Sequence, residues 1–269
     1  MKKCWICGNI ANSGEHKFKA SDLKRTYGKK FDGYYIGEEE IEINSYKEKV
    51  LKFPKIICQN CNENRTRPHD DAYDIFIKYT QNNYDKLLNF KVLDFNDIYG
   101  NNWREMKIHL YRYFAKHAGC KIETFEFSKN TNDLAEFIKG DELIKSFTLK
   151  FELKILIKFI HEQFNKTNKY VHLFNGPTIY FGLNESELNF GGWLSNNWLT
   201  TNWIYSPTIS NSKKIDFNNQ YEELHIKDLE NYQESFYKCK NVKSLICYIE
   251  YGSLNSLERR IEHFKEMID

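Results

Sequence analysis

Four cysteines of this 269-residue chain have a spacing that suits metal binding. They form two C-x-x-C pairs, Cys4 with Cys7 and Cys58 with Cys61. Four thiolates from two such knuckles give a tetrahedral site that suits zinc, and the ion would be structural because no ligand position stays open. Four unrelated buried cysteines are the alternative, but two such pairs seldom arise by chance in so short a span. The pairs therefore predict a structural zinc site.

Groups able to carry out catalysis lie inside and directly after this cysteine frame. The segment Gly-Glu-His-Lys-Phe occupies residues 14–18, and Asn62, Arg65 and Arg67 follow the fourth cysteine. Phosphodiester cleavage needs a nucleophile and neutralisation of charge on the phosphate and the leaving oxygen, which a hard divalent cation on oxygen ligands supplies. Histidine titrates near neutral pH and can take a proton from water. Each residue alone would be unremarkable, so the prediction depends on their order within the frame.

This order resembles that of the HNH endonucleases of the ββα-metal type. Their four-cysteine members read C-x-x-C, then an acidic residue followed by His, then C-x-x-C-N with a basic residue shortly after. The present chain has CWIC, GEHKF and CQNCNENR in that order. The resemblance covers roughly the first eighty residues and depends on about eight positions, which are specific as a set and weak singly. It implies a zinc-stapled module of two strands and a helix that holds one catalytic Mg²⁺ or Mn²⁺ ion.

The resemblance also implies a role for each matching residue. His16 would be the general base that activates water, and Glu15 and Asn62 would hold the catalytic divalent metal ion. The side chains that would contact substrate phosphates are Arg65, which matches the family's basic residue, and Arg67, Lys17 and Lys19.

The chain departs from the family pattern at two positions. The family often has Asp or His where this chain has Glu15, and the longer arm of glutamate shifts a bound metal. Many members have an Asn that braces the loop around the catalytic His, at the position that Phe53 occupies here. Asn60 and Asn64 are nearby candidates for that bracing role. We expect Asp70 to cap the following helix rather than to join the site.

Local patterns predict the elements that position these groups. A short helix is expected at residues 20–27, apolar spacing favours a helix over residues 70–80, and residues 15–18 read as a short strand. An exposed, alternating hairpin is expected at 38–43, and an extended segment at 50–57 leads into the second knuckle. These elements and the cysteine frame form the predicted nuclease module of residues 1–82.

The second half carries no motif that points to a mechanism. An amphipathic helix is expected over residues 103–118 with Gly119 as its C-cap. Alternation predicts a half-buried strand at 147–157, with a helix in the run into Phe159 and Ile160 as the alternative. Strands at 170–174 and 178–183 should form a hairpin around Asn-Gly-Pro. The remaining expectations are a long loop at 189–202, a strand at 245–251 and a helix at 256–267.

Three tryptophans lie in the expected long loop. Trp193, Trp198 and Trp203 would stack bases or bind a partner if they were exposed, and burial beneath the loop is the alternative. His109 and His117 are expected two turns apart on one helix, where packing is favoured over metal binding.

Bulk composition limits the classes of protein. The chain is 41% hydrophobic and 28% charged, so it can bury a core and is not broadly disordered. The formal net charge of +2 gives no overall polyanion signal, although basic residues cluster within the first thirty positions. Neither a signal peptide nor a long apolar span is evident, so we expect a cytoplasmic protein without membrane contact. In that reducing compartment the remaining cysteines are expected to be buried thiols, namely Cys120, Cys239 and Cys247.

The sequence thus predicts an α+β protein of two domains. Residues 1–82 form a zinc-stapled ββα-metal module, and residues 83–269 form an α+β domain with a mainly antiparallel sheet that sets specificity, regulation or oligomerisation. The resemblance implies a metal-dependent endonuclease that acts on double-stranded DNA, in restriction, phage defence or a mobile element. Because two active sites are needed to cut both strands, it also implies a homodimer.

Two other functions stay open. In the first, the zinc frame carries a binding module for nucleic acid or protein, and Glu15, His16 and Asn62 form no reactive centre. In the second, the same chemistry is directed at RNA. A requirement for added Mg²⁺ or Mn²⁺ would separate cleavage from binding, and a comparison of DNA with RNA substrates would separate the two nucleases.

Overall fold

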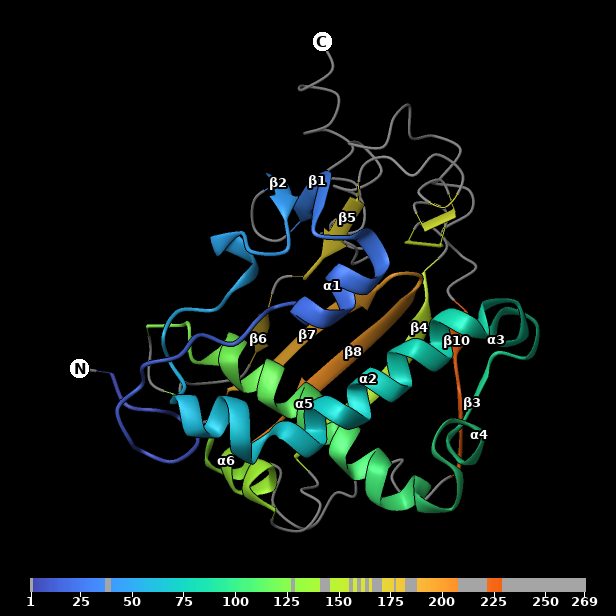
Figure 1. The fold of residues 1–269 in the computed structure, drawn as a ribbon. Helices are drawn as coiled ribbons and strands as arrows, with labels where there is room; N and C mark the ends of the chain where they lie inside the picture. Colours follow the sequence, from blue (N-terminus) through green and yellow to red (C-terminus); the bar gives the residue numbers. More distant parts are fainter. Residues whose placement is uncertain are drawn as a thin grey trace.

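The structure is a computed structural model, and its fold is α+β, as predicted (Figure 1). It describes residues 2–36, 40–126, 129–140, 146–154, 157–158, 161–162, 165, 171–176, 178–181, 188–207 and 222–228. The strand predicted at 245–251, the helix predicted at 256–267, Cys239 and Cys247 lie outside these ranges. Of the helices described, none is both long enough and apolar enough to cross a membrane.

The N-terminal elements largely follow the predicted order. Helix α1 is Ala20–Tyr27, and strands β1 (Lys30–Ile36) and β2 (Glu40–Ser45) form an antiparallel hairpin longer than the one expected. A turn of 3-10 helix, η1 (Lys49–Leu51), and a stretch of π-helix, η2 (Asn60–Arg65), flank the second extended segment.

Helix α2 (Arg67–Asn82) begins earlier than expected, because a proline in its first turn lacks the N–H that a helix start leaves unbonded. Its buried side chains recur at helical spacing, which gives the helix one apolar face. They are His69, Ala72, Tyr73, Phe76, Ile77 and Thr80.

A series of short elements leads from α2 to the longest helix described. They are α3 (Tyr84–Phe90), β3 (Val92–Asp94), α4 (Phe95–Tyr99) and η3 (Gly100–Asn102), followed by α5 (Trp103–Ile122) and α6 (Asn132–Lys139). The prediction that Gly119 caps α5 was wrong, because the helix continues to Ile122. A Cβ at Gly119 would lie 2.2 Å from the ring of Trp5, so this glycine makes room for the tryptophan.

The main sheet has five strands in the order β10-β4-β8-β7-β6. The strands are β4 (Phe147–Leu153), β6 (Ile179–Phe181), β7 (Asn189–Asn196), β8 (Leu199–Tyr205) and β10 (Lys227–Asp228). The β10–β4 pair is parallel and the other pairs are antiparallel, which confirms a mainly antiparallel sheet.

The long loop predicted at 189–202 was wrong, because β7 and β8 form a hairpin there. Asn197, with a φ of 56°, supplies the left-handed residue of the tight turn. Trp198 and Trp203 are each 1% exposed, so for these two the burial alternative is correct.

The hairpin predicted around residues 175–177 was also wrong. Strand β5 (Val171–Phe174) pairs in parallel with β1, whereas β6 pairs with β7. Strand β3 pairs in turn with β9 (Glu223–His225). Sheet pairing therefore links the predicted nuclease module to the second half of the chain.

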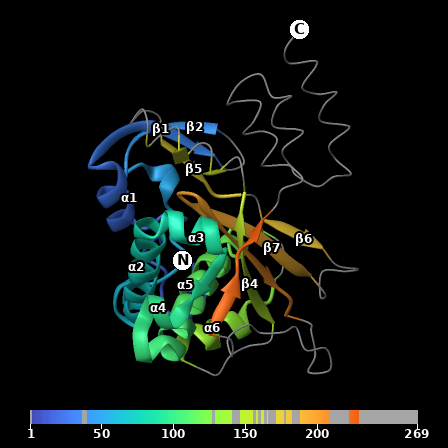
Figure 2. The same ribbon diagram turned by 90° about the vertical axis from the view of Figure 1, so that its right-hand side faces the viewer.

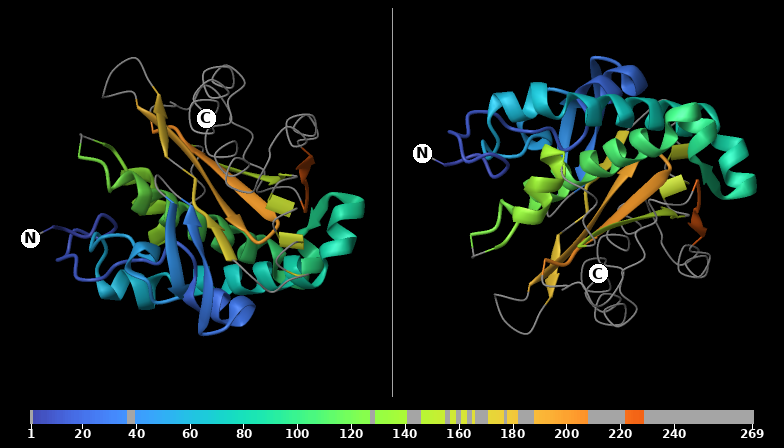
Figure 3. Two further views of the ribbon diagram at one scale, coloured as in Figure 1. Left: turned by 90° about the horizontal axis from the view of Figure 1, so that it is seen from above. Right: turned by 90° about the horizontal axis from the view of Figure 1, so that it is seen from below.

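Helices and sheet form two packed layers. Figures 2 and 3 show α2 and α5 along one side of the five-stranded sheet. The rings of Phe76 on α2 and Phe114 on α5 both contact Phe151 on β4. One hydrophobic core includes buried residues from Cys4 to Ile226. The division into two domains at residue 82 stays a prediction, but the packing across it is extensive.

Candidate functional site

The four predicted zinc ligands come together. One sulfur from each of Cys4, Cys7, Cys58 and Cys61 lies within 4.8 Å of the others, and none of these cysteines is in a disulfide. In a tetrahedral zinc site with Zn–S bonds of about 2.3 Å, the sulfurs are roughly 3.8 Å apart. The Sγ atoms of Cys7 and Cys58 are 3.6 Å apart. The donor set and spacing thus fit a structural zinc ion.

Main-chain and side-chain donors shape this cluster. The N–H of Cys61 donates to the Sγ of Cys58 (3.4 Å), and the Nη1 of Arg65 donates to the Sγ of Cys61 (3.3 Å). Hydrogen bonds of this kind orient the sulfurs that would bind zinc. Arg65 was predicted to contact phosphate; its side chain is exposed, but one of its nitrogens is directed to the cysteine cluster.

The segment that carries Glu15 and His16 pairs antiparallel with residues 51–57. The N–H of Phe53 donates to the carbonyl oxygen of Glu15 (2.8 Å), and the N–H of Lys17 donates to the carbonyl oxygen of Leu51 (2.8 Å). A Cβ at Gly14 would lie 2.5 Å from the carbonyl oxygen of Phe53, so this close approach of two main chains requires glycine. Two paired extended segments, clasped by cysteines and followed by a helix, hold the candidate residues.

The Glu15 carboxylate faces a buried cation from another part of the chain. The Nζ of Lys116, on α5, lies 3.2 Å from Glu15 Oε2 and 3.0 Å from Asp70 Oδ1. It also donates to the hydroxyl of Thr66 (3.2 Å). The Asp70 side chain does not cap α2 as expected; Thr66 occupies the N-cap position, and the Asp70 carboxylate bonds to Lys116 instead.

Burial and pairing oppose each other in this cluster of Glu15, Asp70 and Lys116. Burial raises the pKa of Glu15, although the nearby ammonium of Lys116 opposes the rise. Burial acts against the charge on Lys116, but the carboxylates of Glu15 and Asp70 outweigh it and raise the pKa of Lys116. A charged lysine is therefore held between two acidic groups inside the protein.

His16 lies opposite Lys52 in the antiparallel pairing and is half-buried. Burial lowers the pKa of His16, and the positive charges of Lys52 and Lys116 lower it further. The imidazole is therefore neutral at pH 7 and able to accept a proton. The charge of Lys116 acts on both His16 and Glu15, so the two predicted residues share one electrostatic environment.

Asn62 lies beside the same segment. Its Nδ2 donates to the hydroxyl of Ser13 (3.0 Å), which leaves its Oδ1 without a hydrogen bond to any described residue. Glu15 Oε1 likewise has no ion pair or hydrogen bond within the described ranges. One carboxylate oxygen and one amide oxygen, with water, are a ligand set that Mg²⁺ accepts. Apart from the four cysteines, no cluster of three His, Cys, Asp or Glu residues suited to a metal occurs in the described residues.

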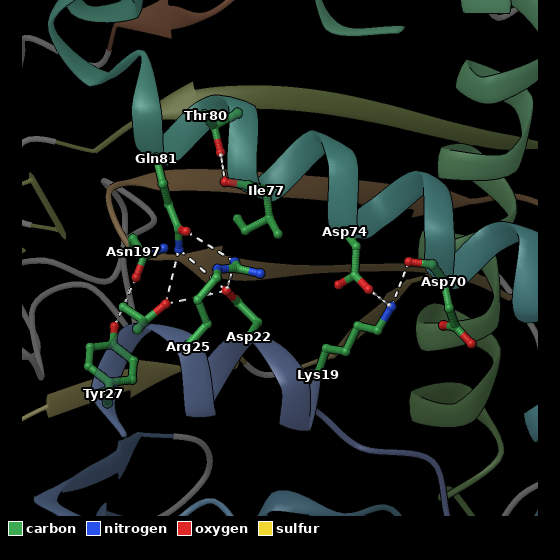
Figure 4. A network of polar contacts seen from close by, with 11 residues as sticks. Lys19, Asp22, Arg25, Tyr27, Asp70, Asp74, Ile77, Thr80, Gln81 and Asn197 are labelled. Carbon is green, nitrogen blue, oxygen red and sulfur yellow. Dashed lines mark hydrogen bonds and ion pairs between the residues drawn. The ribbon is translucent and has the colours of Figure 1, made fainter. Parts of the chain in front are cut away.

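The predicted phosphate contacts differ in availability. Lys17 donates to the hydroxyl of Tyr35 (3.0 Å). Figure 4 shows Lys19 between the main-chain oxygen of Asp70 (2.6 Å) and the carboxylate of Asp74 (2.8 Å). Arg67 is exposed at the start of α2. Lys52 is also exposed and lies beside His16, although the sequence analysis did not single it out.

Phe53, which occupies the family's bracing position, and the two candidate substitutes make side-chain contacts with other residues. Phe53 is buried, and its ring packs edge-on against His117 with centroids 5.3 Å apart. Asn64 donates to Asn60 (3.1 Å), so the two candidate substitutes bond to each other on the surface. The bond that joins position 53 to this segment comes from the Phe53 main chain.

Lys116 has a role that was not predicted from the sequence. It lies three positions after Tyr113 on the predicted helix, next to the apolar stripe, and a lysine there was the available signal. Its carboxylate partners are 46 and 101 positions away, and no local pattern links them. Comparisons of the chain with protein-family models, curated proteins and solved structures find no match.

Proposed function

We propose that this protein is an HNH-type endonuclease that hydrolyses phosphodiester bonds in DNA, with His16 as the general base. The observation that carries the proposal is the pairing of residues 13–17 with 51–57 beside the four-cysteine cluster. It presents Glu15 and His16 from one segment, beside the Asn62 side chain that follows the second knuckle. That arrangement has the strand, strand and helix order of the family that the motifs resemble.

The proposed reaction uses groups of this chain in defined roles. The neutral imidazole of His16 accepts a proton from water while the water oxygen forms a bond to phosphorus. The bond from phosphorus to the leaving sugar oxygen breaks, and that oxygen takes a proton from solvent. Glu15 and Asn62 would hold Mg²⁺ or Mn²⁺, which when bound would offset negative charge on the phosphate and the leaving oxygen. Arg65, Arg67 and Lys17 would contact phosphates of the substrate.

Double-stranded DNA is the proposed substrate. Support comes from exposed basic side chains on the segment paired with His16, namely Lys52 and Lys55, and after the second knuckle, namely Arg65 and Arg67. Phosphate contacts of this kind provide affinity and orientation without reading sequence. The residues beyond 82 would then select the target, and a homodimer would cut both strands. Restriction or phage defence is the setting that such an enzyme would serve.

A binding module without cleavage is the second candidate, and one observation favours it. The carboxylate proposed to hold the metal is ion-paired to Lys116, and Lys17 and Lys19 are engaged within the protein. A module whose acidic group is neutralised internally would still display basic side chains to a polyanion. In that case the cysteine cluster would be structural and the acidic group would be part of the core.

Cleavage of supercoiled plasmid by the zinc-loaded chain, with and without Mg²⁺ or Mn²⁺, tests the proposal. We expect wild type to nick or linearise DNA only with added metal, and His16→Ala to retain zinc but lose at least about a hundredfold in rate, as removal of a general base does. His225→Ala is the matched control, because His225 is exposed on β9, a strand that carries none of the proposed site residues. A single-stranded RNA assayed in parallel identifies the RNA-directed alternative. Zinc-loaded wild type that cuts neither polymer under any metal would favour the binding module.

A further inference from the structure

Lys116 combines deep burial with full charge pairing. Its side chain is 1% exposed, and its ammonium has oxygens of Glu15, Asp70 and Thr66 within 3.2 Å. The three partners come from two separate segments, and α5 supplies the lysine. A buried ammonium surrounded by oxygens of this kind is arranged as a bound cation would be.

We propose that Lys116 is the resident counter-cation of the Glu15 site, and that it sets how tightly this site binds a divalent metal ion. The inference rests on the proposed function, in which Glu15 is a metal ligand. Lys116 binds one oxygen of that carboxylate, Oε2, and leaves Oε1 open. It is therefore a positioning residue, which fixes the orientation of the ligand and opposes the charge of an incoming ion.

The charges determine the direction of the effect. With Lys116 in place, Glu15 and Asp70 carry a combined charge that one ammonium partly cancels. A divalent ion at the open oxygen of Glu15 gains attraction from the carboxylates and is repelled by the ammonium. Without the ammonium, that repulsion is gone, while the carboxylate of Glu15 keeps its attraction for the ion. Removal of the positive charge should therefore strengthen metal binding.

A merely structural lysine would behave differently. Loss of a packing residue would loosen the site and weaken any metal binding, or leave it unchanged. Lys107, on the same helix, provides the matched control. It is 0% exposed and lies over the ring of Phe95 with Nζ 4.4 Å from the centroid, at the opposite end of α5 from Glu15. The substitution to methionine keeps chain length and removes the charge in both cases.

Titration of Mn²⁺ into the zinc-loaded full chain, followed by calorimetry without nucleic acid, tests the inference. We expect Lys116→Met to bind Mn²⁺ roughly tenfold or more tightly than wild type, as loss of one nearby positive charge implies. Lys107→Met should match wild type. In the Lys116→Met background, Glu15→Gln should abolish the gain, because it removes the negative charge that the ammonium had paired with.

The outcomes are separable from those of the plasmid assay. If Lys116→Met retains zinc and binds Mn²⁺ no more tightly than wild type, the inference is overturned, whether or not the chain cuts DNA. If binding is tighter and depends on Glu15, the inference stands even when no cleavage occurs. Should Lys116→Met fail to fold, Lys116→Gln replaces it, since its neutral amide can still donate to an oxygen, and the same two results decide.

Discussion

Each end of α5 carries a buried lysine, and the pKa values of the two lysines shift in opposite directions. Near the start of the helix, Lys107 lies over the rings of Phe95 and Tyr111, and burial lowers the pKa of Lys107 to about 7. Near the end, two carboxylates surround Lys116 and hold its pKa above the ordinary value. The two side chains are equally inaccessible. At Lys116, the charges of Glu15 and Asp70 therefore outweigh the effect of burial.

The N-terminal module is attached to the same end of α5 as Lys116. Trp5 packs on Gly119, the Phe53 ring contacts His117, and Glu15 pairs with Lys116. All three contacts fall on the last two turns of α5, beyond the predicted boundary of the nuclease module. The candidate site is therefore completed by a helix that the motifs do not include.

Removal of zinc should produce the largest effect. It should destabilise the end of α5 that contacts the N-terminal module and leave the other end largely unchanged. Structural zinc contributes roughly 10 kcal/mol or more to folding in small zinc modules. We expect chelation, or Cys58→Ser, to lower hydrogen-exchange protection in the last two turns of α5 more than in its first two. Cys120→Ala, which lies outside the zinc cluster and adds no buried hydroxyl, should retain zinc and lose less protection. Equal loss of protection at both ends would mean that the cluster does not anchor this part of the helix.

Replacement of each lysine by methionine tests the comparison directly. Lys116→Met leaves Glu15 and Asp70 without their shared cation, and removal of one partner of a buried pair costs about 3–5 kcal/mol. Lys107→Met should cost much less, because burial already disfavours the charge on Lys107. Urea unfolding monitored by circular dichroism gives both free energies. Similar losses in the two variants would contradict the distinction between them.

The smallest effect is expected from pH. The pKa of Lys107 is lowered to about 7 in the folded state, so at lower pH the folded protein bears the cost of a buried charge, and above pH 7 it releases the proton. Unfolded lysine keeps its proton up to about pH 10.4, so the stability of wild type relative to Lys107→Met should rise by about 1 kcal/mol from pH 7 to 8.

Lys116 should give no such change over that interval. Its folded pKa is raised, so the stability that it contributes is fully present at pH 7–8 and is lost only as pH rises above the range of ordinary lysine. Unfolding measured at pH 7.0, 7.5 and 8.0 on wild type and both methionine variants provides the comparison. A Lys107→Met curve that stays parallel to wild type would show that the Lys107 charge is not disfavoured by burial.

Local patterns predicted the features whose partners are near in sequence or repeat regularly. The cysteine spacing predicted the cluster, apolar spacing predicted the buried face of α2, and alternation predicted β4 from its first residue. Each of these depends on a motif or a period that the chain itself displays.

Features that depend on distant partners could not be read this way. The β7–β8 strands contain glycines and asparagines that favour loops, and their pairing and the burial of Trp203 overcome that tendency. Gly119 looked like a helix end because its reason, the Trp5 ring, lies 114 positions away. The ion pairs of Lys116 could not be predicted for the same reason, because its partners are distant in the sequence. The charge state of the candidate site depends on those ion pairs.

The central claim is that His16 performs base catalysis in a centre built on Glu15 and Asn62. The most direct measurement is the single-turnover rate of cleavage of an end-labelled DNA duplex at saturating Mn²⁺, for zinc-loaded wild type and His16→Ala. The account predicts cleavage by wild type and a loss of at least about a hundredfold in the variant at unchanged zinc content and Mn²⁺ affinity. Equal rates for the two proteins, or no cleavage by either, would contradict it.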